Sequence, residues 1–223
     1  MNCIYCYSKC RKKGFQANGT QKYQCKSCRK YQQLVYSYKA YDKELNDFIV
    51  KLVKRASGIR DISYVLKISH TTVIDRIKKI ASKISKPLLT ENSQSYEADE
   101  LSTKLISRGR AKDIYVSYII SCSTGCVVDF TIGGRDKETL GKIIRPVLEY
   151  SPHRIYTDAL ATYASLIPKA IHRLTKHLIN KIERMHLTLR TRLKRLNRNF
   201  MCQSRSKALL EACLKIYFWG ATY

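Results

Sequence analysis

The chain has 223 residues, enough for one domain of ordinary size together with small modules. Its 42 Lys and Arg against 17 Asp and Glu give a formal net charge of +25, which points to a polyanionic partner such as nucleic acid. No run approaches the roughly 18 apolar residues of a membrane-spanning helix, and Met1 is not followed by a signal peptide. We therefore expect no membrane partner and a cytoplasmic location at the nucleoid.

Five of the nine cysteines fall within the first 28 residues, where helical periodicity is weak. A segment of about 40 residues buries too little apolar surface to fold unaided, so it needs a bound metal ion or disulfides to stabilise it. The cysteines include two CxxC pairs, at residues 3–6 and 25–28. Two CxxC pairs at this distance along the chain are typical of a closed structural Zn²⁺ site with four thiolate ligands, whereas two disulfides are the alternative. Cys10 is a spare ligand. The four predicted zinc ligands are Cys3, Cys6, Cys25 and Cys28.

Lysines, arginines and tyrosines surround these cysteines. Such a ribbon suits contact with a DNA backbone, although a ribbon that docks onto another protein has the same composition. We assign residues 1–40 to this module.

Residues 41–92 form a second expected module, in which apolar residues recur at intervals of three and four. The segment 62–80 (ISYVLKISHTTVIDRIKKI) predicts a helix-turn-helix whose second helix begins near Ser69 or His70. An ordinary three-helix bundle gives the same pattern, and Lys67 occupies the turn, where glycine is common. In a helix-turn-helix the outward residues of the second helix would face the major groove of DNA: His70, Thr71, Thr72, Asp75, Arg76 and Lys79.

The chain as a whole is expected to be multidomain α+β, and residues 93–223 are expected to form an α/β domain with a mixed sheet. We expect strands at 96–101, 113–122 and 126–132, a helix at 137–150, and a short strand that ends before Asp158. A short helix at 159–168, a strand at 172–174, a long helix at 176–199 and a last helix at 207–219 complete the expected order.

Three carboxylates stand out in this basic chain: Asp99, Asp158 and Glu183. Asp99 and Asp158 accompany short apolar strands, so they meet at one sheet edge if the strands are neighbours. Carboxylate oxygens select Mg²⁺ or Mn²⁺, and two such ions about 4 Å apart support displacement at phosphorus. Taken singly, each acid could equally be a surface or capping residue. The competitors are Glu97, which shares a strand face with Asp99, Glu100, which points to the other face, and Asp129.

Glu183 lies on the long helix, beside a predicted buried stripe of Ile182, Met185, Leu189, Leu193 and Leu196. The same side of the helix also carries cations. This arrangement suits a metal ligand next to a surface that binds DNA phosphates, although a solvated helix face is the alternative. The cations expected to follow the phosphates are Arg184, Arg190, Arg192, Lys194, Arg195 and Arg198.

These motifs together resemble the transposases of the insertion sequence 1 family, with two reading frames present as one continuous chain. The similarity covers CKSCRKYQQL, IRDISYVLKISHTTVIDRIKK, EADE, RIYTDA and INKIERMHLTLRTRLKRLNR. After Glu-Arg, related sequences usually have His-Asn, where this chain has Met185-His186. The resemblance implies a zinc ribbon and a helix-turn-helix that bind terminal inverted repeats, and an RNase H-like catalytic domain with the triad Asp99, Asp158 and Glu183.

We therefore expect a DDE-type transposase that nicks the transposon ends and transfers the freed 3′-hydroxyl to target DNA, acting as a dimer or higher oligomer. The alternatives are a catalytically silent DNA-binding regulator descended from a transposase and an RNase H-like nuclease without strand transfer.

Overall fold

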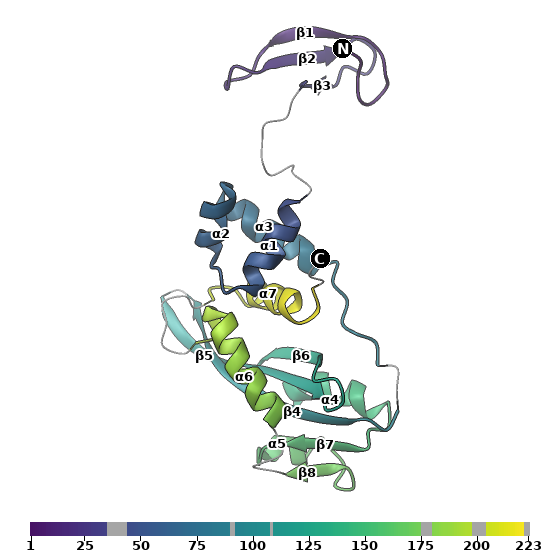
Figure 1. Ribbon diagram of the computed structural model, residues 1–223, viewed down its shortest axis with the longest axis vertical. Helices are drawn as coiled ribbons and strands as arrows, with labels where there is room; N and C mark the ends of the chain where they lie inside the picture. Colours follow the sequence, from purple (N-terminus) through teal and green to yellow (C-terminus); the bar gives the residue numbers. More distant parts are fainter. Residues whose placement is uncertain (35–43, 90–91, 108, 175–179, 198–203, 221–223) are drawn as a thin grey trace. The chain divides into compact units, whose positions relative to one another are not determined.

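The computed structural model describes residues 1–34, 44–89, 92–107, 109–174, 180–197 and 204–220 (Figure 1). The chain divides into two compact units, residues 1–42 and 43–223. In the described part, no helix has the length and apolar character needed to cross a membrane.

The first unit is a small antiparallel sheet of three strands, β1 (Cys10–Phe15), β2 (Gln21–Cys25) and β3 (Tyr31–Gln32), in the order β1-β2-β3. The turn between β1 and β2 contains Asn18-Gly19. Gly19 has φ +76°, a conformation that glycine adopts without steric cost, and the Asn18 side chain accepts a hydrogen bond from the Thr20 amide.

The second unit begins with three short helices, α1 (Leu45–Lys54), α2 (Ile59–Leu66) and α3 (His70–Ala81), where the periodicity predicted them. Ser69 caps α3, because its hydroxyl accepts a hydrogen bond from the Thr72 amide. Lys67 ends α2 in the left-handed conformation, with φ 52° and ψ 45°. Ile49, Ile62 and Val73 are buried between the helices.

The last helix, α7 (Lys207–Trp219), packs against α1 and α3 and lies between them and the large sheet in Figure 1. Lys54 at the end of α1 donates a 2.6 Å hydrogen bond to the carbonyl of Gly220, the residue that caps α7. A cation is favourable at this position because the unpaired carbonyls at a helix C-terminus carry partial negative charge.

The large sheet has five strands: β4 (Ser95–Ser107), β5 (Arg110–Ser121), β6 (Val127–Gly133), β7 (Arg154–Thr157) and β8 (His172–Leu174). Their order is β6-β5-β4-β7-β8. The sheet is mixed, as predicted, because β4, β5 and β6 are antiparallel whereas β7 runs parallel to both β4 and β8.

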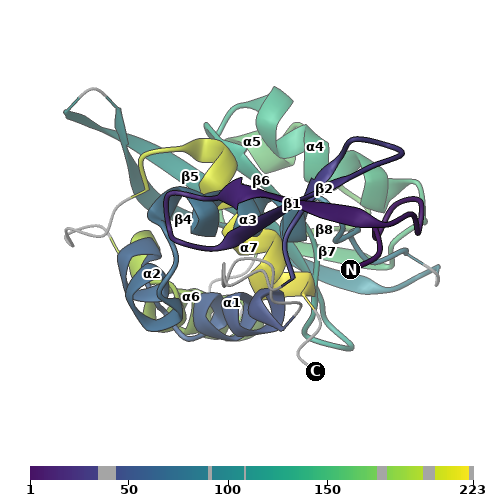
Figure 2. The same cartoon turned by 90° about the horizontal axis from the view of Figure 1, so that it is seen from above.

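Helices cover both faces of this sheet (Figure 2). On one face, α4 (Lys137–Leu148) and α5 (Ala161–Ala164) pack on a core that includes Ala98, Ile119 and Tyr163. On the other face, α6 (Asn180–Arg192), the short 3-10 helix η2 (Lys194–Leu196) and α7 enclose a second core around Leu101 and Tyr118.

Three elements differ from the sequence prediction by more than two residues in length. The strand predicted at 96–101 extends to Ser107. It continues because β4 pairs with β5 from Tyr96 to the end of the hairpin. The short helix α5 has only four residues. The predicted helix 176–199 is regular only from Asn180 to Arg192, and residues 176–179 and 198–199 lie outside the described residues.

The helix ends there because the chain crosses β4. Leu193 has φ −130° and ψ 86°, and the Thr103 hydroxyl of β4 donates a hydrogen bond to the carbonyl of Arg195. Leu193 and Leu196 are thereby both buried, and together with Ile182 and Leu189 they form the stripe that the periodicity predicted.

Candidate functional site

Two neighbouring parallel strands carry Asp99 and Asp158. Glu97 of β4 is paired with Tyr156 of β7, so two residues further along each strand the register brings Asp99 beside Asp158. Asp158 directly follows β7, whereas Asp99 lies within β4, at the point where its pairing with β7 ends. The carboxyl end of the β4–β7 pair therefore presents two acids at one edge of the sheet.

Glu100 joins these two acids. Asp99, Glu100 and Asp158 can each offer a carboxylate oxygen such that all three oxygens lie within 4.8 Å of one another. The Glu100 side chain is fully buried, and its Oε1 atom has no hydrogen-bond partner in the described part of the chain. A buried, unsatisfied carboxylate oxygen beside two further carboxylates fits a hard divalent cation such as Mg²⁺ or Mn²⁺.

Arg135 lies directly against this group of three acids. Its Nη2 atom is 3.0 Å from Glu100 Oε2 and 3.7 Å from Asp158 Oδ2, and its guanidinium lies 5.1 Å from the centre of the Tyr115 ring. The arginine follows β6, just before Asp136 caps α4. One cation therefore offsets part of the negative charge of three carboxylates.

The remaining charge shifts the proton affinity of the group. Burial raises the pKa of Asp99 to about 7; the amide of Glu100 opposes this shift by donating to Asp99, and the charges of Glu100 and Asp158 reinforce it. Burial likewise raises the pKa of Glu100, against the opposing effects of Tyr163 and Arg135. Divalent-ion binding requires deprotonated carboxylates, so it competes with protons at this group.

Helix α6 is held against the same strand by Glu97, which is buried on the opposite face from Glu100. Glu97 Oε2 accepts a 2.9 Å hydrogen bond from the amide of Ile182, in the first turn of α6. A carboxylate at a helix N-terminus satisfies an otherwise unpaired amide and complements the helix dipole. Glu97 is therefore occupied in fixing α6 and does not join the group of three acids.

His186 is the residue of α6 that approaches the acids. Its Nδ1 atom is 3.8 Å from Asp99 Oδ2, and its ring packs edge-on against Tyr118 at 5.4 Å between centres. Burial lowers the pKa of His186 to about 4, and the positive charge of Arg190 acts in the same direction, so the imidazole is neutral at pH 7.

Glu183, the third predicted ligand, is exposed on α6 and is not a member of the group of three acids. It precedes His186 by three residues and is therefore its neighbour on the helix surface. Asp129, another candidate, is paired with Lys86 at 2.6 Å. Sequence reasoning assigned Glu100 to the far side of the strand and missed its approach to Asp158; the available signal was the adjacent Asp-Glu pair in β4.

The predicted DNA-binding residues lie on α3, on α6 and on the short helix η2. On α3, His70, Thr71, Asp75 and Lys79 are exposed, whereas Thr72 is half-buried. Arg76 is also half-buried, and it donates a 3.1 Å hydrogen bond to Asn46 of α1. On α6 and η2, Arg184, Arg190, Arg192 and Lys194 are exposed and Arg195 is half-buried, while Arg198 lies outside the described residues.

The four predicted cysteines gather in the first unit. The Sγ atoms of Cys3 and Cys28 are 3.6 Å apart, those of Cys6 and Cys25 are 3.4 Å apart, and one ion could contact all four. Tetrahedral Zn–S bonds of about 2.3 Å require sulfur separations of about 3.8 Å, close to these values. A hydrogen bond from the Ser8 amide lowers the pKa of Cys6 to about 6, whereas burial and the neighbouring thiols raise the pKa of Cys28 to about 12. The donor set therefore fits a closed thiolate metal site.

Comparison with known proteins identifies the family of this chain. Residues 95–223 match the family model described as IS1 transposase. Insertion element iso-IS1n protein InsB of Shigella dysenteriae is 33% identical over 102 residues, which cover 46% of this chain and 78% of that protein. Insertion element iso-IS1N protein InsA of the same organism is 29% identical over 79 residues, covering 35% of this chain and 88% of that protein. The chain belongs to the IS1 transposase family, and its role is in transposition.

Proposed function

We propose that this chain is a DDE-type transposase that binds terminal inverted repeats, nicks the transposon ends and transfers the 3′-hydroxyl to target DNA. The observation that carries the proposal is the position of Asp99 and Asp158 side by side where the parallel pairing of β4 and β7 ends, with the buried Glu100 beside them. Family membership supplies the role in transposition.

The strand order supports an RNase H-like catalytic domain in residues 93–223. Across the sheet the strands follow the order β6-β5-β4-β7-β8, which is 3-2-1-4-5 when β4 is counted as the first strand in chain order. Strands β4, β5 and β6 are antiparallel, whereas β7 and β8 run parallel to β4. Helices pack on both faces, and the acids lie on the first and fourth strands, in the centre of the sheet.

In this proposal Asp99 and Asp158 hold two divalent ions, Mg²⁺ or Mn²⁺, which when bound activate the attacking oxygen and stabilise the leaving oxygen at phosphorus. Glu183 is the third catalytic carboxylate; it lies three residues before His186, whose Nδ1 atom is 3.8 Å from Asp99 Oδ2. Glu100 adds a fourth carboxylate, and Arg135 fixes its orientation. Neutral His186 and Tyr118 screen one side of Asp99 from water.

The remaining modules bind DNA in this proposal. Residues 1–40 form a zinc ribbon held by Cys3, Cys6, Cys25 and Cys28, which satisfy the spacing of a Zn²⁺ site. Residues 41–92 form a helix-turn-helix and linker, in which exposed residues of α3 read the terminal repeats. Joining two transposon ends requires two copies of the protein or more, acting at the nucleoid.

A nicking assay tests the proposal. A duplex that carries the inverted repeats flanking the gene is incubated with protein and Mg²⁺, and nicked and joined products are separated. We expect wild type to nick and join, and Asp158→Asn and Glu183→Gln each to abolish both products while DNA binding persists. Glu138→Gln is the matched control, because Glu138 is exposed on α4 and its ion pair among the described residues is with Lys142. Nicking by Asp158→Asn at the wild-type rate would refute the proposal.

A second candidate function is a DNA-binding regulator without catalysis. It is favoured by the exposed position of Glu183 outside the group of three acids and by the neutralisation of Glu100 and Asp158 by Arg135. Repeat binding by wild type without nicking, in Mg²⁺ and in Mn²⁺, would identify the regulator. Nicking without joined product would identify a nuclease instead.

A further inference from the structure

A cationic pocket of about 640 Å³ opens between three helices of the second unit. Its walls come from α1 with its C-terminal cap, from α6, and from α7. We call it the α1–α6–α7 pocket. It is lined by Lys51, Lys54, Arg55, Thr188, Arg192 and Tyr217.

The charge of this pocket is unbalanced. Four of its lining residues are cations, and none of its lining residues in the described chain is an acid. Lys51, Arg55 and Arg192 are exposed, and within the described residues none of the three forms an ion pair. Lys54 has a structural contact, since it donates to the Gly220 carbonyl. Cations gathered without counter-charges repel one another, so the pocket is suited to an anion.

Helix α6 separates this pocket from the acids. At 100° per residue, Thr188 and Arg192 lie on one side of the buried stripe, and Glu183 and Arg190 lie on the other. The electrostatic contacts agree with this geometry: the charge of Arg190 acts on His186, which touches Asp99, whereas the charge of Arg192 acts on Tyr217 in the pocket. A phosphate in the pocket is therefore a different phosphate from one at the acids.

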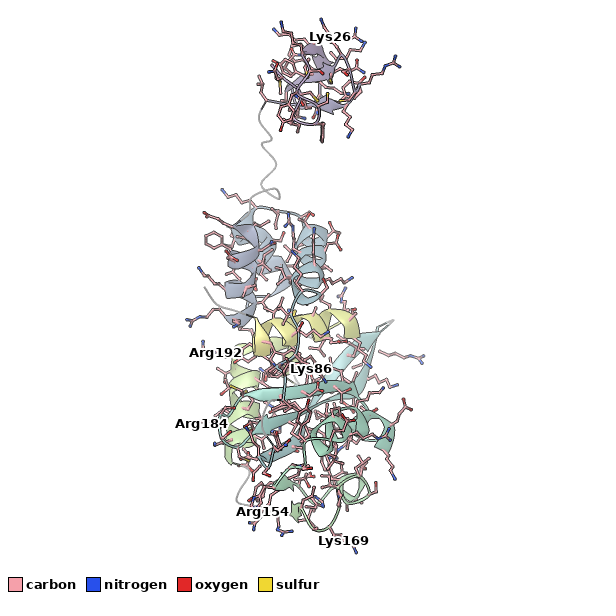
Figure 3. The ribbon with its side chains drawn as sticks, turned by 90° about the vertical axis from the view of Figure 1, so that its right-hand side faces the viewer. Lys26, Lys86, Arg154, Lys169, Arg184 and Arg192 are labelled. Carbon is pink, nitrogen blue, oxygen red and sulfur yellow. The ribbon has the colours of Figure 1, made fainter. Side chains whose placement is uncertain are left out.

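The pocket also connects two parts of the second unit. Lys51 lies on α1, and Arg55 is the C-cap residue of α1. Arg192 is the last residue of α6, the helix whose first turn is fixed by Glu97. Figure 3 shows Arg192 at the end of α6 beside α7 and Arg184 further along the same helix. An anion in the pocket therefore lies between α1 and α6.

We propose that the α1–α6–α7 pocket binds backbone phosphates of double-stranded DNA at a point away from the cleavage site. This inference rests on the proposed function only in taking DNA as the partner. Phosphate contacts fix the position of a protein on DNA and carry no sequence information directly. The pocket thus positions one DNA molecule against α3 and the acids together.

The test compares two triple variants with the same reduction of charge. The pocket variant is Lys51→Gln, Arg55→Gln and Arg192→Gln, which spares Lys54 because of its bond to α7. The control variant is Lys142→Gln, Arg154→Gln and Lys169→Gln, which removes three exposed cations elsewhere on the same unit. In Figure 3, Arg154 and Lys169 lie far from Arg192. Binding to a fluorescein-labelled duplex of arbitrary sequence is measured by anisotropy between about 50 and 200 mM salt.

Removing one cation that neutralises a DNA phosphate should reduce the slope of log K against log salt by about 0.9. We expect the slope of the pocket variant to be smaller by about 2 to 3 and its binding to be at least tenfold weaker, whereas the slope of the control variant should change by less than about 1. Mn²⁺ binding, followed by electron paramagnetic resonance, and the thermal midpoint should match wild type in both variants.

The inference is overturned if the pocket and control variants have the same slope and affinity, or if inorganic phosphate binds the pocket while the DNA slope is unchanged. Its failure is separable from that of the proposed function. Wild type that binds DNA but does not nick refutes the catalytic proposal and leaves the pocket result intact, whereas wild type that binds no DNA refutes both.

Discussion

Arg135 donates to Glu100 across 3.0 Å, and this pair joins the start of α4 to the central strand of the sheet. Arg135→Gln would leave a fully buried carboxylate without its cation. Because 38% of the Arg135 side chain is exposed, water offsets part of the loss, so we expect roughly 1–2 kcal/mol less stability in urea unfolding. The double variant with Glu100→Gln should recover most of this loss. Additive losses in the double-mutant cycle would contradict a direct Arg135–Glu100 interaction.

Asp99→Asn should stabilise the metal-free protein in a pH-dependent manner. The pKa of Asp99 is about 7 in the folded protein against 3.8 as the ordinary value, so the folded state holds a proton that the unfolded state releases. Wild-type stability therefore falls as pH rises from about 4 to about 7, by at most about 4 kcal/mol, and the asparagine variant lacks this fall.

Thermal unfolding at pH 5 and pH 8, without added divalent ions, measures the effect. The advantage of Asp99→Asn over wild type should grow between the two pH values. An advantage that is equal at both values, or larger at pH 5, would show that the Asp99 pKa is not raised by folding.

Glu97→Ala should loosen the start of α6. The variant leaves the Ile182 amide without its acceptor, which costs roughly 1–3 kcal/mol for a buried group. Glu97→Gln keeps a carbonyl acceptor and should lose less. Hydrogen exchange of the α6 amides checks the prediction: we expect faster exchange at Ile182 in the alanine variant than in the glutamine variant. Equal exchange in both would rule out the hydrogen bond as the cause.

Cys25→Ser should lower zinc content and unfold the first unit alone. The thiolate site supplies the folding free energy of a segment that has little core, and the second unit has two cores of its own. Cys10→Ser is the control, because Cys10 is not one of the four grouped cysteines. Zinc content and circular dichroism of the purified protein measure the effect. Equal zinc loss in both variants would make Cys10 a ligand.

Lys67→Gly should stabilise the turn between α2 and α3. A side chain in the left-handed conformation costs roughly 1–2 kcal/mol, and the greater freedom of glycine in the unfolded chain cancels part of the gain. We expect a net gain of about 0.5 kcal/mol in urea unfolding and none for Lys67→Ala. A loss of stability on Lys67→Gly would mean that the lysine side chain makes a compensating contact.

The sequence predicted α7 at residues 207–219 because its apolar residues are dense and regular, and the structure has the helix at these residues. The sequence prediction underestimated the length of β4, because three polar residues, 102–104, follow its predicted end and are extended through their pairing with β5. The local sequence pattern does not show which strand will pair with a segment. Cross-strand pairing can stabilise a strand even where the composition of that segment does not favour one.

The site shows the same limit. Alternation placed Glu100 on the opposite face of β4 from Asp99, and its contacts with Arg135 agree. Alternation gives the direction in which a side chain leaves the strand but not how far a flexible carboxylate reaches round the strand end toward Asp158. Helical periodicity likewise put Glu183 on a flank of the buried stripe, yet its distance from the acids depends on where α6 packs, which Glu97 sets.

The support that α7 gives to α1 and α3 also orders events during synthesis. The ribosome releases α1 and α3 long before residues 207–219, so the surfaces of both helices that contact α7 stay uncovered while the sheet is being made. A product that stops before residue 207 lacks this support, and Lys54 loses its acceptor at Gly220. Complete translation is therefore a condition for the final packing of the first three helices.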